Sequence, residues 1–179
     1  VLECGGKNPC VVLEDAEHLD DVAQHVVNAV FWNMGENCSA NSRLIVHEKI
    51  KPALMERILQ RVRDWPTGNP LDPRNRLGAI VSKAHYDKIV GLIETGKTEG
   101  AKVLIGGDRV SENVDGDGFF VQPTIFDEVR PGMTIAREEI FGPVLSVITV
   151  SNTDEAIRVA NDTASVSYTH LTLPTKVTV

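Results

Sequence analysis

Short apolar runs alternate along the chain with longer segments in which apolar residues recur at helical spacing. Residues 8–13 and 43–46 are nearly continuous apolar runs, a pattern typical of strands buried on both faces of a parallel sheet. Between them, apolar residues recur every three or four positions from residue 19 to residue 30. This spacing predicts an amphipathic helix that packs one face on the sheet.

The same alternation continues to residue 161. Further helices are predicted over residues 50–65, 82–95 and 154–161, and further extended segments over residues 103–105, 119–121, 123–126 and 145–150. Ser82 is expected to cap the helix that follows it, because a serine hydroxyl can accept a hydrogen bond from the first turn. Strands that alternate with amphipathic helices indicate a layered α/β domain with a mainly parallel sheet.

Composition narrows the class of protein. Of the 179 residues, 42% are hydrophobic and 24% charged, as in an ordinary globular domain. The formal net charge of −7 argues against nucleic-acid or anionic-membrane partners, which need clustered Lys and Arg. No apolar run approaches the roughly 18 residues of a membrane span. The 3 cysteines fit neither a disulfide framework nor a zinc site, so we expect no metal, reduced thiols and a cytoplasmic location.

The two ends of the chain differ from its middle. The chain begins at Val1 without an initiator methionine, and we interpret it as an internal fragment of a longer protein. Residues 164–179 contain no acidic residue, no glycine and 4 threonines. We therefore interpret residues 1–163 as part of one domain and residues 164–179 as a non-native tail that adds no stability.

Cys38 is the candidate nucleophile. It follows the predicted helix and Gly35, a glycine that can adopt the left-handed conformation closing a helix. A thiol on a turn between a packed helix and a strand can be both exposed and rigidly aimed. The competing interpretation is a small buried hydrophobic residue, and we apply it to Cys4 and Cys10, which fall in strand-like segments.

Three stretches together resemble signature segments of the NAD(P)-dependent aldehyde dehydrogenase superfamily. Residues 3–7 read Glu-Cys-Gly-Gly-Lys, residues 35–38 read Gly-Glu-Asn-Cys, and residues 139–143 read Glu-Ile-Phe-Gly-Pro. They occur in the family's order, and Glu3 and Cys38 are about as far apart as in the family. The resemblance covers about residues 1–163 and implies a three-layer fold, as in the family's catalytic domain.

The resemblance also implies roles for individual residues. Cys38 would attack an aldehyde and carry first a thiohemiacetal and then a thioester, and Glu3 would be the general base for its hydrolysis to a carboxylate. Glu139 would hold the ribose hydroxyls of NAD or NADP, and Phe141 would lie beside the nicotinamide. The substrate would be a small aldehyde, with a lean toward aminoaldehydes, and the full-length protein a homo-oligomer.

One expected cofactor element is missing from the sequence, which has no glycine-rich phosphate loop. In the family the dinucleotide-binding domain largely precedes the segment that matches residues 3–7. We therefore expect the isolated fragment to be inactive and to bind NAD poorly. We also expect Glu3 and Cys38 to share a cleft at the carboxyl ends of adjacent strands.

Two other classes of function stay open on sequence alone. A Cys/His hydrolase or acyltransferase would need a histidine beside Cys38, and no histidine has an obvious partner carboxylate at motif spacing. The other possibility is a folded fragment without catalytic function. NAD-dependent aldehyde oxidation by the full-length protein, with Cys38→Ala as control, discriminates between them.

Overall fold

The computed structural model describes residues 5–108, 110 and 118–163. Its centre is a five-stranded sheet with strand order β1-β2-β5-β4-β3. The pairs β1–β2, β2–β5 and β5–β4 are parallel, whereas β3 joins the edge antiparallel to β4. The strands are β1 (Pro9–Val12), β2 (Arg43–His47), β3 (Lys102–Ile105), β4 (Thr124–Asp127) and β5 (Val144–Val150).

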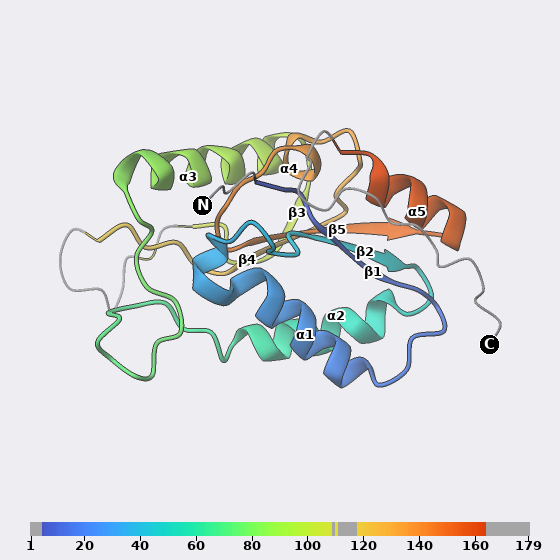
Figure 1. The fold of residues 1–179 in the computed structure, drawn as a ribbon, viewed down its shortest axis with the longest axis horizontal. Coiled ribbons are helices and arrows are strands. Elements are labelled where there is room, and N and C mark those ends of the chain that lie inside the picture. Colours follow the sequence, from blue (N-terminus) through green and yellow to red (C-terminus); the bar gives the residue numbers. More distant parts are fainter. Residues whose placement is uncertain (1–4, 109, 111–117, 164–179) are drawn as a thin grey trace.

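Helices cover both faces of this sheet, so the fold has three layers (Figure 1). The layer below the sheet in Figure 1 holds α1 and α2, and the layer above it holds α3, α4 and α5. The helices are α1 (Leu19–Phe31), α2 (Lys51–Val62), α3 (Lys83–Thr98), α4 (Thr134–Arg137) and α5 (Thr153–Asn161). A short 3₁₀ turn, η1 (Trp32–Gly35), extends the end of α1.

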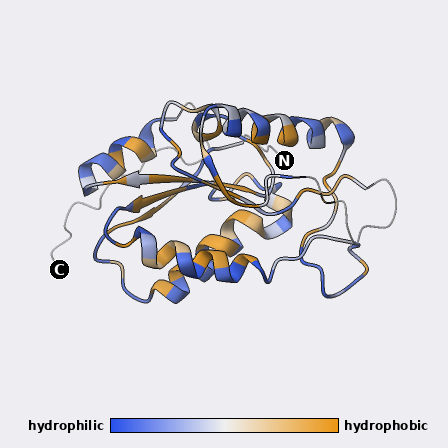
Figure 2. Ribbon diagram, turned by 180° about the vertical axis from the view of Figure 1, so that it is seen from behind, coloured by the Kyte–Doolittle hydropathy of each residue, from blue (hydrophilic) through white to orange (hydrophobic). Residues whose placement is uncertain are grey.

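The central strands are mostly apolar because both of their faces are buried. In β2, Leu44 and Val46 pack into the core shared with α1 and α2, whereas Ile45 packs into the core on the opposite face. All five residues of β2 are buried. Figure 2 shows the consequence, with mostly hydrophobic strands between helices that carry both hydrophobic and hydrophilic sides. A strand of this kind reads as a continuous apolar run in the sequence.

The structure confirms the predicted α/β class, its mainly parallel sheet and its helices. The N-cap expected at Ser82 is present, since its hydroxyl accepts from the His85 N–H at 3.3 Å. Residues 119–121 were expected to be extended and form no strand of the sheet; β4 begins only at Thr124. Helix α4 was not predicted, because its four residues are too short to show a helical period.

Candidate active site

Cys38 lies on a tight turn between η1 and β2. The turn is closed by the Ala40 N–H, which donates to the Asn37 carbonyl oxygen at 3.0 Å. The Asn37 side-chain oxygen accepts from both the N–H and the hydroxyl of Ser39, at 3.2 and 3.0 Å. The residues on either side of Cys38 thus hold the turn together, and Cys38 itself is half-buried.

The expected position of this turn on the sheet was wrong. We predicted the carboxyl ends of the strands, but the turn precedes β2 and therefore lies at its amino end. Glu139 and Phe141 precede β5, which is the parallel neighbour of β2, so they reach the same edge. The reason is topological, since a helix that follows one strand returns the chain to the amino end of the next parallel strand.

Two of the motifs meet at Gly35, which has a φ of +70°. A Cβ atom at this position would lie 2.2 Å from the Gly142 carbonyl oxygen and 3.0 Å from the Pro143 nitrogen. Only glycine allows this approach of two backbones. Gly35 was expected to close the helix itself, but α1 ends at Phe31 and Gly35 closes the 3₁₀ turn after it.

The first and third motifs also meet. The Gly6 N–H donates to Glu139 Oε1 at 2.8 Å. A Cβ atom on Gly5 would lie 2.4 Å from Glu139 Oε2, so the carboxylate occupies the space that a side chain at Gly5 would need. The two glycines of the Gly-Gly-Lys segment therefore contact the Glu139 carboxylate and hold it in place.

A buried arginine fixes the segment that carries these glycines. Arg43 is only 1% exposed, and its Nε donates to the Lys7 carbonyl oxygen at 2.8 Å. Its two terminal nitrogens donate to the carbonyl oxygens of Val159 and Ala160 at 3.0 and 2.9 Å. These carbonyls lie in the last turn of α5, where the Val159 oxygen also accepts from the Asp162 N–H at 3.3 Å. Arg43 thus ties the segment at Lys7 to α5.

Lys7 is the unusual charged group of this region. Its side chain is 1% exposed, and its Nζ has no hydrogen-bond partner among the described residues. Burial, helped by the neighbouring Arg43 and opposed by Glu139, lowers the pKa of Lys7 from 10.5 to about 7. A buried ammonium without a partner is costly, so the neutral amine is favoured.

Asn8 links the same segment to Cys38. Its side-chain nitrogen donates to the Cys38 carbonyl oxygen at 2.6 Å, and the residue is 6% exposed. Together with the contacts at Gly35 and Gly6, this hydrogen bond brings the three motifs into one connected region. Nothing in the sequence pattern signals the contact, because 30 positions separate the two residues.

Phe141 lines a cavity of about 460 Å³ with Asn33, Met34, Glu36, Ala79 and Val81. Its own backbone is left-handed, with a φ of 56°, and its carbonyl oxygen lies 2.6 Å from His85 Nε2. The same nitrogen lies 3.6 Å from Glu36 Oε1. His85 therefore has a carboxylate nearby in the fold, although Glu36 is too distant in sequence to form a recognisable motif with it.

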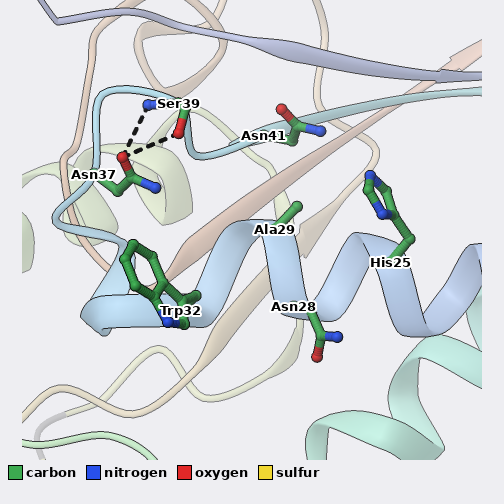
Figure 3. A pocket seen from close by; sticks show the side chains of 7 residues that line it. All are labelled: His25, Asn28, Ala29, Trp32, Asn37, Ser39 and Asn41. Atoms are coloured by element: carbon green, nitrogen blue, oxygen red, sulfur yellow. Dashed lines mark hydrogen bonds between the residues drawn. The ribbon is translucent and has the colours of Figure 1, made fainter.

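A second cavity, of about 360 Å³, is lined by residues of α1 and of the cysteine turn (Figure 3). Its lining includes Asn37 and Ser39, the two neighbours of Cys38 in the chain. Trp32, at the end of α1, lies beside Asn37 in Figure 3 and is 62% exposed. The remaining lining residues are His25, Asn28, Ala29 and Asn41.

The structure thus places three of the four predicted site residues. Cys38, Glu139 and Phe141 belong to loops that meet at the amino edge of the sheet. Glu3 lies outside the described residues, as do Cys4 and the segment 164–179. The described part of the chain contains no cluster of His, Cys, Asp or Glu that could hold a metal ion. None of its helices is long and apolar enough to cross a membrane.

Comparison with known proteins agrees with this geometry. The sequence profile of the aldehyde dehydrogenase family matches residues 1–167. The chain belongs to the aldehyde dehydrogenase family. It is 56% identical over 163 residues to aminoacetaldehyde dehydrogenase of Pseudomonas aeruginosa, a match that covers 91% of this chain and 32% of that protein. It is 48% identical over 162 residues to peroxisomal aminoaldehyde dehydrogenase 1 of Malus domestica, covering 90% of this chain and 32% of that protein.

The fold is shared as well. The NAD-dependent aldehyde dehydrogenase from Sinorhizobium meliloti matches with a TM-score of 0.82 at 44% identity, over 89% of this chain and 31% of that one. The resemblance seen in the three motifs is therefore confirmed at the level of family and fold. The chain spans about a third of the length of these relatives.

Proposed function

We propose that the protein containing this chain oxidises an aldehyde to a carboxylate with NAD or NADP, and that Cys38 is its nucleophile. The observation that carries the proposal is the meeting of three separate loops at one edge of the sheet. Glu139 is seated on Gly6 at 2.8 Å, Gly35 packs against Gly142, and Asn8 holds the Cys38 carbonyl at 2.6 Å. This junction brings the three motifs into one region, as a shared catalytic site requires.

The chemistry begins with the Cys38 thiolate. Its sulfur adds to the aldehyde carbon, a C–S bond forms, and the carbonyl electron pair moves to oxygen. The Cys38 backbone N–H is the donor of this chain that we assign to this oxyanion. Loss of hydride leaves a thioester, and water then breaks the C–S bond to release the carboxylate and the thiol. Glu3 is the general base we assign to that water.

The described residues fit one part of a dinucleotide. Glu139 offers a carboxylate held by a backbone N–H, and Phe141 offers an aromatic ring on an open cavity. A bound nicotinamide would supply the hydride acceptor. A glycine-rich phosphate loop is absent from the sequence, so the chain holds residues for the nicotinamide riboside half only. We accordingly propose that the isolated chain is inactive.

The cavity lined by Asn37 and Ser39, the two neighbours of Cys38, could accept a cationic or polar aldehyde. Trp32 presents an exposed ring there, and an indole face attracts an ammonium group by about 0.5–2 kcal/mol. Asn37, Ser39 and Asn41 add side chains that can hydrogen-bond to a small polar substrate. Two relatives are named for aminoacetaldehyde and for aminoaldehydes. We therefore propose aminoaldehydes as the substrate class.

The experiment is aldehyde-dependent formation of NADH or NADPH by the full-length protein. Cys38→Ala should reduce the rate at least about a thousandfold, because no other group can form the thioester. Cys10→Ala is the matched control and should stay within about threefold, because Cys10 lies in strand β1. Full activity of Cys38→Ala would refute the proposed mechanism.

Glu3 has a separate test. In Glu3→Gln, acylation should survive while deacylation fails, so a burst of NADH should be followed by slow turnover. Loss of the burst together with turnover would remove Glu3 from the role of general base without affecting the assignment of Cys38.

The Cys/His hydrolase alternative gains little from the structure. His85 reaches the region, but its Nε2 faces the Phe141 carbonyl oxygen at 2.6 Å. A base for the thiol would have to present that nitrogen, or the other one, to sulfur. Hydrolysis of a simple thioester or ester without any cofactor would be the result that favours this alternative.

A further inference from the structure

We propose that Asn8 is a positioning residue for the nucleophile, because its side-chain amide holds the central peptide of the turn that carries Cys38. The inference rests on the proposed function of Cys38. It goes beyond that function by assigning a role to a residue that belongs neither to the nucleophile nor to the general base. The argument starts from the geometry of the turn itself.

In the four-residue turn from Asn37 to Ala40, Cys38 and Ser39 are the two central residues. The peptide that joins them is the unit that rotates by about 180° between turns of type I and type II. Its carbonyl oxygen is that of Cys38. The orientation of this peptide sets the backbone of Cys38 on its carboxyl side and therefore constrains the direction in which the thiol can point.

Asn8 forms its hydrogen bond to this central peptide of the turn. The acceptor is the Cys38 carbonyl oxygen at 2.6 Å. Because a carbonyl can only accept, the donor must be the amide nitrogen of Asn8, which fixes the orientation of the Asn8 side chain. Ser39 does not adopt a left-handed conformation, whereas a type II turn would require one at its position. The hydrogen bond is therefore made to the non-flipped peptide.

The donor is itself held in place. The Asn8 carbonyl oxygen accepts from the Arg43 N–H at 3.2 Å, and Arg43 Nε donates to the preceding carbonyl, that of Lys7, at 2.8 Å. Asn8 is 6% exposed, so water competes poorly for its amide. A side chain anchored in this way can restrain the turn, since the restraint does not depend on a mobile surface group.

Asn8 does not line either cavity near the turn. We therefore expect its loss to affect the aim of the nucleophile more than the binding of the aldehyde. A misplacement of about 1 Å can cost about a hundredfold in rate. The expected signature is a fall in kcat of about 10- to 100-fold with a KM for aldehyde that changes less than about threefold.

The test compares Asn8→Asp with Asn75→Asp in the full-length protein. Asn8→Asp keeps the shape and replaces the donor by an acceptor facing the Cys38 carbonyl. Asn75 is a matched control, because its side-chain nitrogen also donates to a backbone carbonyl, that of Asn69, at 3.0 Å. Asn75→Asp should keep kcat within about twofold. A normal kcat in Asn8→Asp, or a loss expressed only as a raised KM, would overturn the proposal.

A second measurement reads the turn without any chemistry. Cys38–Ser39 is the only Cys-Ser peptide in the chain, so labelling the carbonyl carbon of cysteine and the nitrogen of serine isolates this one peptide by NMR. The carbonyl shift should move upfield in Asn8→Ala, as expected on loss of a hydrogen bond, and stay unchanged in Asn75→Ala. An unchanged shift in Asn8→Ala would overturn the proposal.

The two proposals can fail separately. A wild-type protein that oxidises no aldehyde with NAD or NADP would refute the proposed function, while the NMR result would still decide whether Asn8 holds the turn. Should Asn8→Asp fail to fold, Asn8→Ala is the second variant for the kinetic test, since it removes the donor without adding a charge. Its kcat should fall in the same range.

Discussion

The central strands and the loops that lead into them follow different rules. In β2 every residue is buried and every residue is paired in register with β5. In the loops before these strands, Asn33, Met34 and Phe141 have positive φ angles, although none of them is glycine. The strands are stable because they are regular, whereas the loops are irregular and must be stabilised by specific contacts.

The free-energy cost of the strained loop backbones indicates how strongly neighbouring contacts must stabilise them. A left-handed conformation costs a non-glycine residue roughly 1–2 kcal/mol. Such strain persists only where the surroundings over-determine the backbone. Here the supports are particular contacts, such as the bond between His85 and the Phe141 carbonyl at 2.6 Å. The regular sheet therefore supports loops at its amino edge whose backbones are strained.

The largest loss of stability is expected from a substitution that leaves a cavity in the sheet. Leu44 is 0% exposed in the centre of β2, and Leu44→Ala should destabilise the protein by about 4 kcal/mol. Urea unfolding of the chain measures this change. Leu71→Ala, at a leucine that is 89% exposed, is the control and should stay within about 0.5 kcal/mol. Equal losses in the two variants would contradict the burial of β2.

The next largest effect concerns the loops. Gly35→Ala places a Cβ atom 2.2 Å from the Gly142 carbonyl oxygen at a φ of +70°, so it should cost about 3 kcal/mol through strain and loop displacement. Gly132→Ala is the matched control, because a Cβ atom there has no neighbour within 4 Å. If both glycines tolerated alanine equally in urea unfolding, the two backbones at Gly35 would not be in contact.

The same contrast explains how much of the molecule could be predicted from the sequence. The longer helices and the central strands were predictable, because two-sided burial makes strands such as β2 largely apolar and one-sided burial gives α1 its helical period. The β3–β4 pair is antiparallel and lies at an edge. Its direction is set by chain geometry that no local pattern encodes.

The sequence offered candidate residues for the site but not the contacts between them. The motifs identified Cys38, Glu139 and Phe141, but their roles rest on resemblance. The contact of Glu36 with His85 joins residues 49 positions apart, and that of Asn8 with Cys38 joins residues 30 positions apart. Such contacts depend on which loops the fold brings to one edge, and that depends on the strand order.

A third test compares one cysteine from each region. Burial raises the pKa of the Cys10 thiol to about 11, so at about pH 8 only roughly one Cys10 in a thousand is a thiolate. Cys38 on its turn should therefore react with iodoacetamide at least about 100-fold faster, as mapped by mass spectrometry after brief labelling. Preferential labelling of Cys10 in folded protein would count against Cys38 as the reactive thiol.

The smallest expected effect is a pH dependence of stability caused by Lys7, whose pKa is lowered to about 7 in the folded protein. In the unfolded chain this pKa returns to its ordinary value near 10.5. Between these values the unfolded chain holds a proton that the folded protein has released, so stability should rise with pH. Cys10 acts in the opposite sense above about pH 9, because its folded pKa is raised to about 11.

The pH range in which Cys10 does not oppose Lys7 therefore runs from about pH 7 to about pH 9. Over this range the free energy of unfolding should increase by about 1–2 kcal/mol. Urea unfolding at several pH values measures the increase. Lys7→Met removes the titrating group while keeping an unbranched apolar side chain, so its stability should change little over the same window. A rise in Lys7→Met equal to that of the wild type would show that another group is responsible. A flat profile in the variant would assign the pH dependence to Lys7. Its Nζ is the buried side-chain nitrogen that has no hydrogen-bond partner among the described residues.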